Sequence, residues 1–410
     1  DFCLSRGLGD VYKRQEDPTE AVKSLNRALE SAEDAKRQYF IISFAGWAPG
    51  AILWVEAPYA EYYWELASWE TNLGKRRELL EKAREATPDL LSRAEKSGGI
   101  HYIGYAHHVV SKVLMSQAMM ETNLEEKKRL LEKALKHRNA DIRIVEQYLP
   151  FGYWFRGVVR MYLARTKYQL ADLSKDLESE KNMLQEAAVD AENALKLCVK
   201  DLTFLDREGT ISQQNYAVGN WQHVYGNLLK RLYDVTRNRE YLMKAMEAFE
   251  DSAESMQKLD MISRVAESNW QIAQTYDALD KHLKAAESFT LASNNYKSAA
   301  EKIPQLKDLY RDFSLYMQAW NEIEKARHYH GKQEYGSAKE HYENAATLHK
   351  SLKQWSYLAP NYSAWASIEN AEDLSRRERS EEALQTFERA AKLFTETKKS
   401  LETKLGEIEN

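Results

Sequence analysis

Small and apolar residues recur along the chain with helical spacing. At Ala285, for example, Phe289 follows four positions later and Ala292 seven positions later. Residues at i, i+4 and i+7 share one face of an α-helix, so the triplet predicts a helix with one buried stripe. The alanine lets a neighbouring helix approach closely, and the aromatic ring fills the groove beside it. Further triplets of this kind begin at Ala21, Ala187, Ala245, Ala338 and Ala383.

A direct repeat adds two more alanines to this series. Glu70-Thr-Asn-Leu73 with Leu79-Leu-Glu-Lys-Ala83 recurs as Glu121-Thr-Asn-Leu124 with Leu130-Leu-Glu-Lys-Ala134, at a spacing of 51 residues. Over the whole series, successive alanines are 40 to 62 residues apart. Two helices of about 20 residues with their turns occupy roughly 50 residues, so each repeat is expected to be a long helical hairpin.

The composition also favours a helical protein. Only 16 Gly and 7 Pro occur in 410 residues, which leaves few residues that break helices. Hydrophobic residues make up 43% and charged residues 30% of the chain, as in globular rather than disordered proteins. We therefore predict an all-α fold, a right-handed α-solenoid of about eight long hairpins, in which each hairpin covers the apolar flank of its neighbour.

Two segments resemble the tetratricopeptide repeat. IAQTYDALDKHLKAAESFTLAS, residues 272–293, carries the resemblance best, followed by YHGKQEYGSAKEHYENAA, residues 329–346. Three features depart from that family: Asp280 and Gln333 stand where a loop glycine is usual, the closing proline is absent, and the spacing exceeds 34 residues. The wider chain is also similar to uncharacterised archaeal repeat proteins, a resemblance that implies no particular activity.

The resemblance implies a concave groove that binds a protein or peptide segment. A tryptophan enters each of three successive first helices, and Trp and Tyr are residue types that often anchor a bound peptide. The alternative is that these large side chains only pack between wide hairpins. The Lys and Asn with which some family members clamp a C-terminal carboxylate are absent from these positions. The implied groove residues are Trp270, Gln274, Asp277, Trp320, Ile323, Arg327, His330, Trp365, Ile368 and Glu372.

A first histidine cluster is a candidate for metal binding. His101, Tyr105 and His108 fall on one helical face, with His107 next to them. A zinc site needs three or four ligands, and no carboxylate or thiolate lies in register with these residues. We expect packed or capping histidines here, and no bound metal.

A second cluster contains His328, His330 and His341 and has Glu324 and Glu334 nearby. His328 and His330 point to different faces of a helix, so a joint metal site needs a partner helix. We again expect no metal, and we expect no cofactor anywhere in the chain.

Cys198 is the remaining candidate for chemistry. It lies in the apolar stretch Leu195-Lys-Leu-Cys-Val199, with no base and no electropositive neighbour to activate a thiolate. We expect a buried small hydrophobic residue. The sequence therefore predicts no catalytic residue and a protein that is not an enzyme.

Charge and cysteine content narrow the partners and the compartment. A formal net charge of -5 argues against nucleic acid, which requires a basic surface. No apolar run approaches the roughly 18–20 residues that span a bilayer, so we expect no membrane partner. Cys3 and Cys198 cannot form a disulfide framework, which favours a cytoplasmic protein. The sequence leaves the oligomeric state open.

The two ends of the chain carry separate expectations. Residues 1–15, DFCLSRGLGDVYKRQ, resemble a translated sequencing-library adapter, so the native chain is expected to begin upstream of Glu16. The last helix keeps an apolar stripe to Ile408, which predicts that the chain continues past Asn410. Between the ends we expect an aromatic-rich block over residues 16–205 and a block of tetratricopeptide-like repeats over residues 206–410.

The function predicted from these patterns is a non-catalytic scaffold that binds a protein or peptide partner in its concave groove. An alternative stays open. The chain can instead be the sensor or adaptor arm of a larger signalling protein whose NTPase, cyclase or DNA-binding domain lies upstream.

Overall fold

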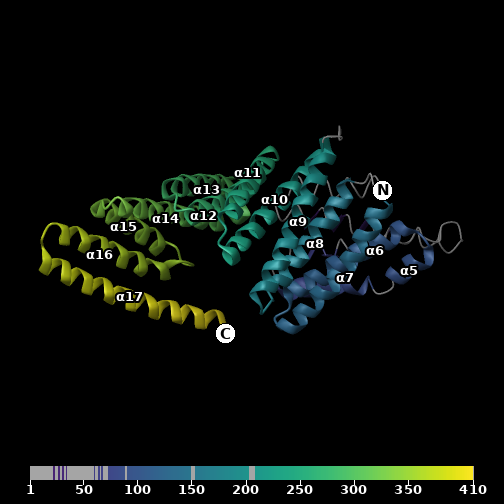
Figure 1. The fold of residues 1–410 in the computed structure, drawn as a ribbon, viewed down its shortest axis with the longest axis horizontal. Coiled ribbons are helices and arrows are strands. Elements are labelled where there is room, and N and C mark those ends of the chain that lie inside the picture. The colour runs from purple at the N-terminus through teal and green to yellow at the C-terminus, as the bar shows by residue number, and fades with distance from the viewer. Residues whose placement is uncertain are drawn as a thin grey trace. The chain divides into compact units, whose positions relative to one another are not determined.

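A computed structural model of the protein describes residues 73–87, 90–148, 153–202 and 208–409, together with isolated positions between residues 22 and 67. Every regular element in this described part is a helix (Figure 1). The predicted all-α fold of long helical hairpins is thereby confirmed. Residues 1–15 and the first anchor alanine, Ala21, lie outside the described residues, so the expectations for them stay predictions.

The chain divides into two compact units. Unit 1 comprises Asp1–Tyr241 and unit 2 comprises Leu242–Asn410. The sequence-based division between residues 205 and 206 stays a prediction, because residues 203–207 are outside the described part.

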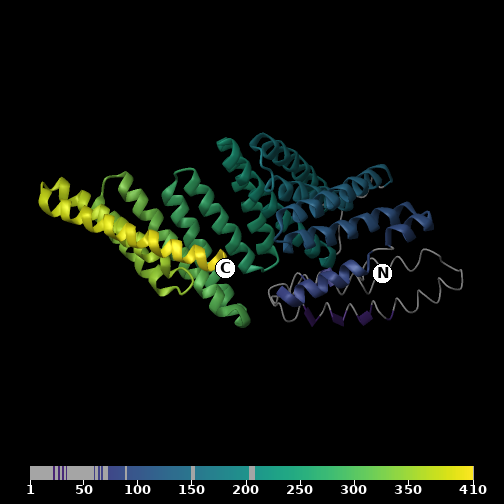
Figure 2. The same ribbon diagram turned by 90° about the horizontal axis from the view of Figure 1, so that it is seen from below.

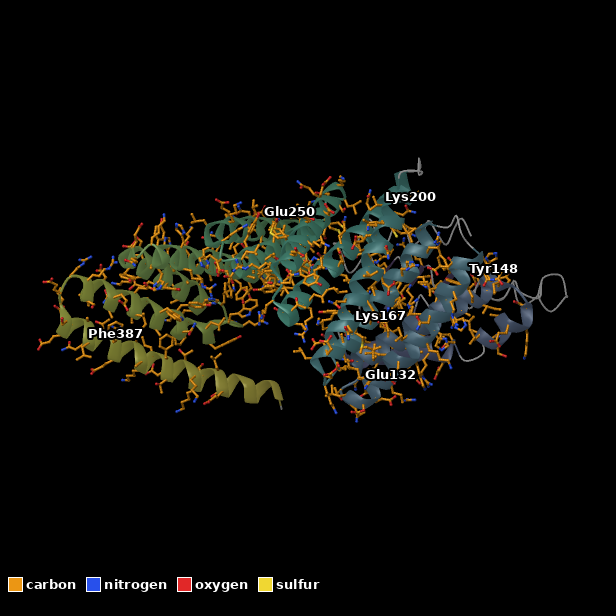
Figure 3. All side chains as sticks on the ribbon, in the orientation of Figure 1. Glu132, Tyr148, Lys167, Lys200, Glu250 and Phe387 are labelled. Carbon is orange, nitrogen blue, oxygen red and sulfur yellow. The ribbon has the colours of Figure 1, made fainter. Side chains whose placement is uncertain are left out.

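In unit 1, consecutive helices pack against one another in chain order, from α6 with α7 to α9 with α10. Figure 3 labels Lys167 of α8, whose Nζ lies 2.9 Å from both Glu186 Oε2 and Asp190 Oδ2 of α9. These ion pairs link the two helices of one hairpin. The described helices are α4 (Leu73–Glu85), α5 (Leu90–Ser97), α6 (Ile100–Met120), α7 (Leu124–Tyr148), α8 (Tyr153–Ala171), α9 (Leu177–Leu202) and α10 (Glu208–Thr236).

Unit 2 repeats this arrangement after α11, which crosses the boundary between the units. Each of the helices α12 to α16 packs on the next, and Figure 2 shows α16 and α17 running side by side as the last hairpin. Two single-turn 3₁₀ helices, Pro304–Leu306 and Ser356–Leu358, precede α14 and α16. The helices are α11 (Arg239–Lys258), α12 (Ile262–Ala278), α13 (His282–Lys302), α14 (Lys307–Gly331), α15 (Tyr335–Ser351), α16 (Ala359–Arg376) and α17 (Ser380–Glu409).

The anchor alanines that the structure describes are buried. In the described part of the chain, those from Ala83 to Ala338 are at most 1% exposed, and Ala383 is 4% exposed. The aromatic rings four residues after Ala245, Ala285 and Ala338 are buried as well. The i, i+4, i+7 stripe is therefore the packing face of each second helix, as the sequence predicts.

Residues other than glycine form the tight turns between the helices of unit 2. Asp280 and Gln333 adopt the left-handed conformation, with φ of 59° and 62°. At Asp280 the turn is closed by the amide of Lys281, which donates to the Tyr276 carbonyl over 2.9 Å, and by the Asp280 amide, which donates to Asp277 over 2.8 Å. This pattern is a Schellman motif, in which glycine is the usual left-handed residue. The missing loop glycine therefore does not change the geometry of the turn.

Candidate functional site

A pocket of about 680 Å³ opens in unit 2 where α13, α14, α15 and α16 meet. Its lining combines aromatic rings with titratable side chains. The pocket is lined by His282, Ile323, Arg327, His328, His330, Gly331, Lys332, Tyr342, Asn361, Tyr362, Trp365 and Glu369.

Three stacked aromatic rings form one wall of the pocket. Tyr342 of α15 stacks on Tyr362 and on Trp365 of α16, at centroid distances of 6.4 Å and 6.1 Å. Phe394 of α17 supports the Trp365 ring edge-on at 5.6 Å. Tyr342 and Tyr362 are buried, whereas 40% of Trp365 remains exposed. The Trp365 ring is therefore held by its neighbours and still presents apolar surface to the solvent.

A charged network lies beside this aromatic wall. Nη1 of Arg327 lies 2.7 Å from Oδ1 of Asp277 and 2.9 Å from Oε1 of Glu324. His282 Nδ1 lies 2.8 Å from the second oxygen of Glu324. The Glu324 side chain is 0% exposed, so both of its oxygens are satisfied inside the protein. Arg327 thereby joins α12 to α14, and Glu324 joins α14 to α13.

Burial governs the protonation of the two innermost carboxyl groups. Loss of solvent raises the pKa of Glu324, the negative charge of Asp277 raises it further, and Arg327 and His282 act in the opposite direction. Burial likewise raises the pKa of Glu369, against the effect of its hydrogen bond with His330. Each buried carboxylate thus depends on a cationic or imidazole partner from a neighbouring helix.

The second histidine cluster does not form one joint site. His330 Nδ1 lies 2.9 Å from Glu369 Oε1 of α16, and His341 Nδ1 lies 2.8 Å from Glu322 Oε2 of α14. A partner helix, α16, does supply a carboxylate to His330. His341, however, pairs with a different glutamate, so the two histidines do not share a ligand. Their role in the structure is to connect helices.

The structure brings together only part of the predicted groove. The predicted residues that line the pocket are Ile323, Arg327, His330 and Trp365. Asp277 does not line it but is hydrogen-bonded to Arg327. Trp270 packs on Phe313 and Tyr316, and Trp320 stacks on Phe289. Gln274, Ile368 and Glu372 are half-buried and do not line the pocket. Whether any of the ten residues contacts a partner stays a prediction.

The pocket residues that sequence reasoning missed include His282, Tyr342, Tyr362 and Glu369. The contacts His282–Glu324 and His330–Glu369 join residues 42 and 39 positions apart, in different hairpins. One available signal was the position of Glu369 four residues after Trp365, on the same helical face.

In unit 1, the first histidine cluster contains a buried polar group. His101 is exposed, whereas His108 is buried with its Nδ1 3.0 Å from Arg138 Nη1 and 3.2 Å from Asp141 Oδ2. Asp141 lies 33 residues along the chain, on α7, so a carboxylate does stand beside His108 that the local sequence does not show. Burial lowers the pKa of His108 well below its usual value, then Arg138 and Lys112 lower it further. This is a packed histidine, as expected.

Cys198 is a buried cysteine, 0% exposed, which confirms that expectation. A smaller pocket of about 350 Å³ lies between α8 and α10, where burial lowers the pKa of Lys230 to about 8. It has no exposed aromatic anchor comparable with Trp365 among its lining residues. The pocket in unit 2 is therefore the stronger candidate site.

Comparisons with known proteins give one family match and several likenesses to solved structures. A family model described as tetratricopeptide repeat matches residues 7–34, a segment that includes Ala21 and overlaps the adapter-like residues 7–15. The chain is similar to BtubC (BKLC) from P. vanneervenii, with 15% identity, 68% of this chain and 93% of that chain covered, and a TM-score of 0.39. The apo form of RapI gives 12% identity, coverage of 94% and 98%, and a TM-score of 0.44. Yeast Tom70 gives 14% identity, with 98% of this chain and 94% of that chain covered and a TM-score of 0.19.

No curated protein matches the sequence. The likenesses to solved structures have identities of 11–15% and TM-scores of 0.19–0.44, and no conclusion about this chain is drawn from them. Among the helices that the structure describes, none has the length and apolar character needed to cross a membrane.

Proposed function

We propose that the pocket of unit 2 is part of a groove that binds an extended segment of a protein partner, without a catalytic step. The observation that carries this proposal is Trp365. The residue is 40% exposed although Tyr342 and Phe394 fix the orientation of its ring. A rigid aromatic side chain loses little entropy when a partner covers it, so it provides binding energy efficiently.

The charges of the pocket support a protein partner over a nucleic acid. Asp277 and Glu324 lie within hydrogen-bond distance of Arg327, so this cation is already neutralised from inside the protein. Phosphate recognition depends on cations that can release counterions from the nucleic acid backbone. A pocket whose main cation is balanced in this way favours polar and apolar peptide groups.

The proposal predicts that removing the Trp365 ring weakens partner binding more than folding. Linear peptides selected from a phage-displayed library on the whole chain serve as the probe. We expect Trp365→Ala to reduce the affinity of the selected peptides about tenfold or more, which corresponds to roughly 1.4 kcal/mol, while the melting temperature changes little. Peptide affinity is measured by fluorescence polarisation.

Trp270→Ala is the matched control, because Trp270 packs on Phe313 and Tyr316 in the core cluster of α12 to α14. We expect it to lower stability by about 3 kcal/mol or more. Peptides that bind Trp365→Ala as tightly as the parent would contradict the proposal. The same holds if Trp365→Ala destabilises the protein as strongly as the control does, because Trp365 then serves packing.

A further inference from the structure

The charged network beside the pocket has the donor set of a metal site. Asp277 lies in the last turn of α12, His282 is the first residue of α13, and Glu324 lies in α14. One imidazole nitrogen and two carboxylate oxygens from these residues all lie within 4.8 Å of one another. The left-handed turn at Asp280 brings Asp277 and His282 to the same side of the hairpin.

The distances are close to those of a first coordination sphere. Nδ1 of His282 lies 2.8 Å from Glu324 Oε2 and 3.9 Å from Asp277 Oδ1. Ligand atoms at about 2.0–2.1 Å from a tetrahedral Zn²⁺ are roughly 3.3 Å from one another, which lies between these two values. The third pair, the oxygens of Asp277 and Glu324, lies within 4.8 Å, so side-chain movements would bring the three donors around one ion.

A cation already lies among these oxygens. The Arg327 guanidinium bonds to both carboxylates, and its side chain also lines the pocket. The pocket leaves room for the guanidinium to swing away, since about 680 Å³ is open beside it. A doubly charged ion would neutralise the two carboxylates more completely than the singly charged guanidinium does.

We propose that Asp277, His282 and Glu324 bind one Zn²⁺ ion, which replaces the guanidinium that now lies between the two carboxylates. The mixed donor set selects the ion: an imidazole nitrogen suits zinc, whereas Ca²⁺ and Mg²⁺ prefer six or more oxygen ligands. Three protein ligands leave one coordination position open. His282 lines the pocket, so the ion is reached from there.

Zn²⁺ binding to the whole chain tests the proposal and requires no peptide, so its outcome is independent of the proposed function. Equilibrium dialysis against Zn²⁺, with excess Mg²⁺ present, gives the number of ions per chain and their dissociation constants. We expect His282→Ala to remove one ion per chain or to weaken its binding about tenfold or more. Asp277→Asn provides a second variant if His282→Ala misfolds, because Asp277 is half-buried.

The matched control is His341→Ala. His341 is 23% exposed and His282 25%, and each Nδ1 lies 2.8 Å from a glutamate of α14. Among the described residues, however, the Glu322 partner of His341 belongs to no three-donor group. The control should bind the same number of ions as the parent, whereas equal binding by His282→Ala and the parent would overturn the proposal.

Arg327→Met tests the replacement of the guanidinium. Removing the competing cation should tighten Zn²⁺ binding about tenfold or more. If the dissociation constant of Arg327→Met is unchanged or larger, Arg327 does not compete with the ion, and the replacement is wrong.

Discussion

At the scale of single residues, His349 shows how burial makes the stability of unit 2 depend on pH. Its side chain is 0% exposed and lies between the rings of Tyr316 and Tyr362. Neither ring nitrogen has a hydrogen-bond partner among the described residues. Burial lowers the pKa of His349 to about 4, so the folded protein keeps the imidazole neutral.

The sign of the effect follows from this shift. Between pH 6.5 and about 4 the unfolded chain binds a proton at His349 that the folded protein does not bind. The free energy of unfolding therefore falls as the pH falls through this range, and it is fully restored above it. The shift corresponds to a loss of about 2 kcal/mol at pH 5.

We predict that His349→Phe makes unfolding less sensitive to acid. The phenyl ring keeps the stacking on Tyr362 and has no nitrogen to protonate or leave unsatisfied. Between pH 7 and pH 5 the parent loses unfolding free energy through His349, and the variant should lose about 2 kcal/mol less than the parent. Urea denaturation at the two pH values measures the difference. Parallel profiles for His349→Phe and the parent would count against the assignment.

At the scale of the elements, the hairpin turns hold residues in a conformation that suits glycine. In the α16–α17 turn Glu378 has a φ of 60°, and the Arg379 amide donates to the Leu374 carbonyl over 3.0 Å. The left-handed region costs an L-residue about 1–2 kcal/mol. The Glu378 side chain is exposed, so little is lost when it is removed.

We therefore expect Glu378→Gly to stabilise the protein. Relief of the left-handed strain exceeds the roughly 0.4–1 kcal/mol by which glycine favours the unfolded chain, for a net gain of about 0.5–1 kcal/mol. Chemical denaturation gives the value. Glu378→Ala keeps the β-carbon and should change stability by less than about 0.5 kcal/mol. A gain of equal size for alanine would show that removal of the charge is responsible, not the backbone conformation.

The helices could be predicted because their signal is local, whereas the pocket could not. Ala285, Phe289 and Ala292 report one helical face within eight residues, and all three are buried. The partner of His282, by contrast, lies 42 residues away in another hairpin, and no local spacing selects Glu324 over its neighbours. The turn at Asp280 shows a further limit, because hydrogen bonds to Tyr276 and Asp277 hold a geometry that the sequence does not favour.

The same limit applies to the tryptophans. Trp270, Trp320 and Trp365 each lie in the first helix of a hairpin, so the local sequence pattern gives the same prediction for all three. Packing separates them, because Phe313 and Phe289 cover parts of the first two rings while Trp365 stays 40% exposed. Which ring remains accessible depends on the neighbouring hairpin, and that information is not local in the chain.

At the scale of the whole molecule, stability is expected to arise from contacts between neighbouring helices. α17 packs on α16, and unit 1 makes its own internal contacts. In such repeat proteins the unfolding free energy is approximately a sum over repeats and their interfaces. A local defect should therefore open its own hairpin first.

Two adjacent alanines of α17 provide the test. Ala390 is 0% exposed and continues the stripe of Ala383, whereas Ala391 is exposed. We expect Ala390→Leu to overpack the α16–α17 interface at a cost of about 1–3 kcal/mol, and Ala391→Leu to change stability by less than about 0.5 kcal/mol. Hydrogen exchange followed by mass spectrometry should show amides of α16 and α17 exchanging about tenfold faster in Ala390→Leu, with α6 to α9 unchanged. Equal acceleration throughout the described helices would instead mean that the chain unfolds as one cooperative block.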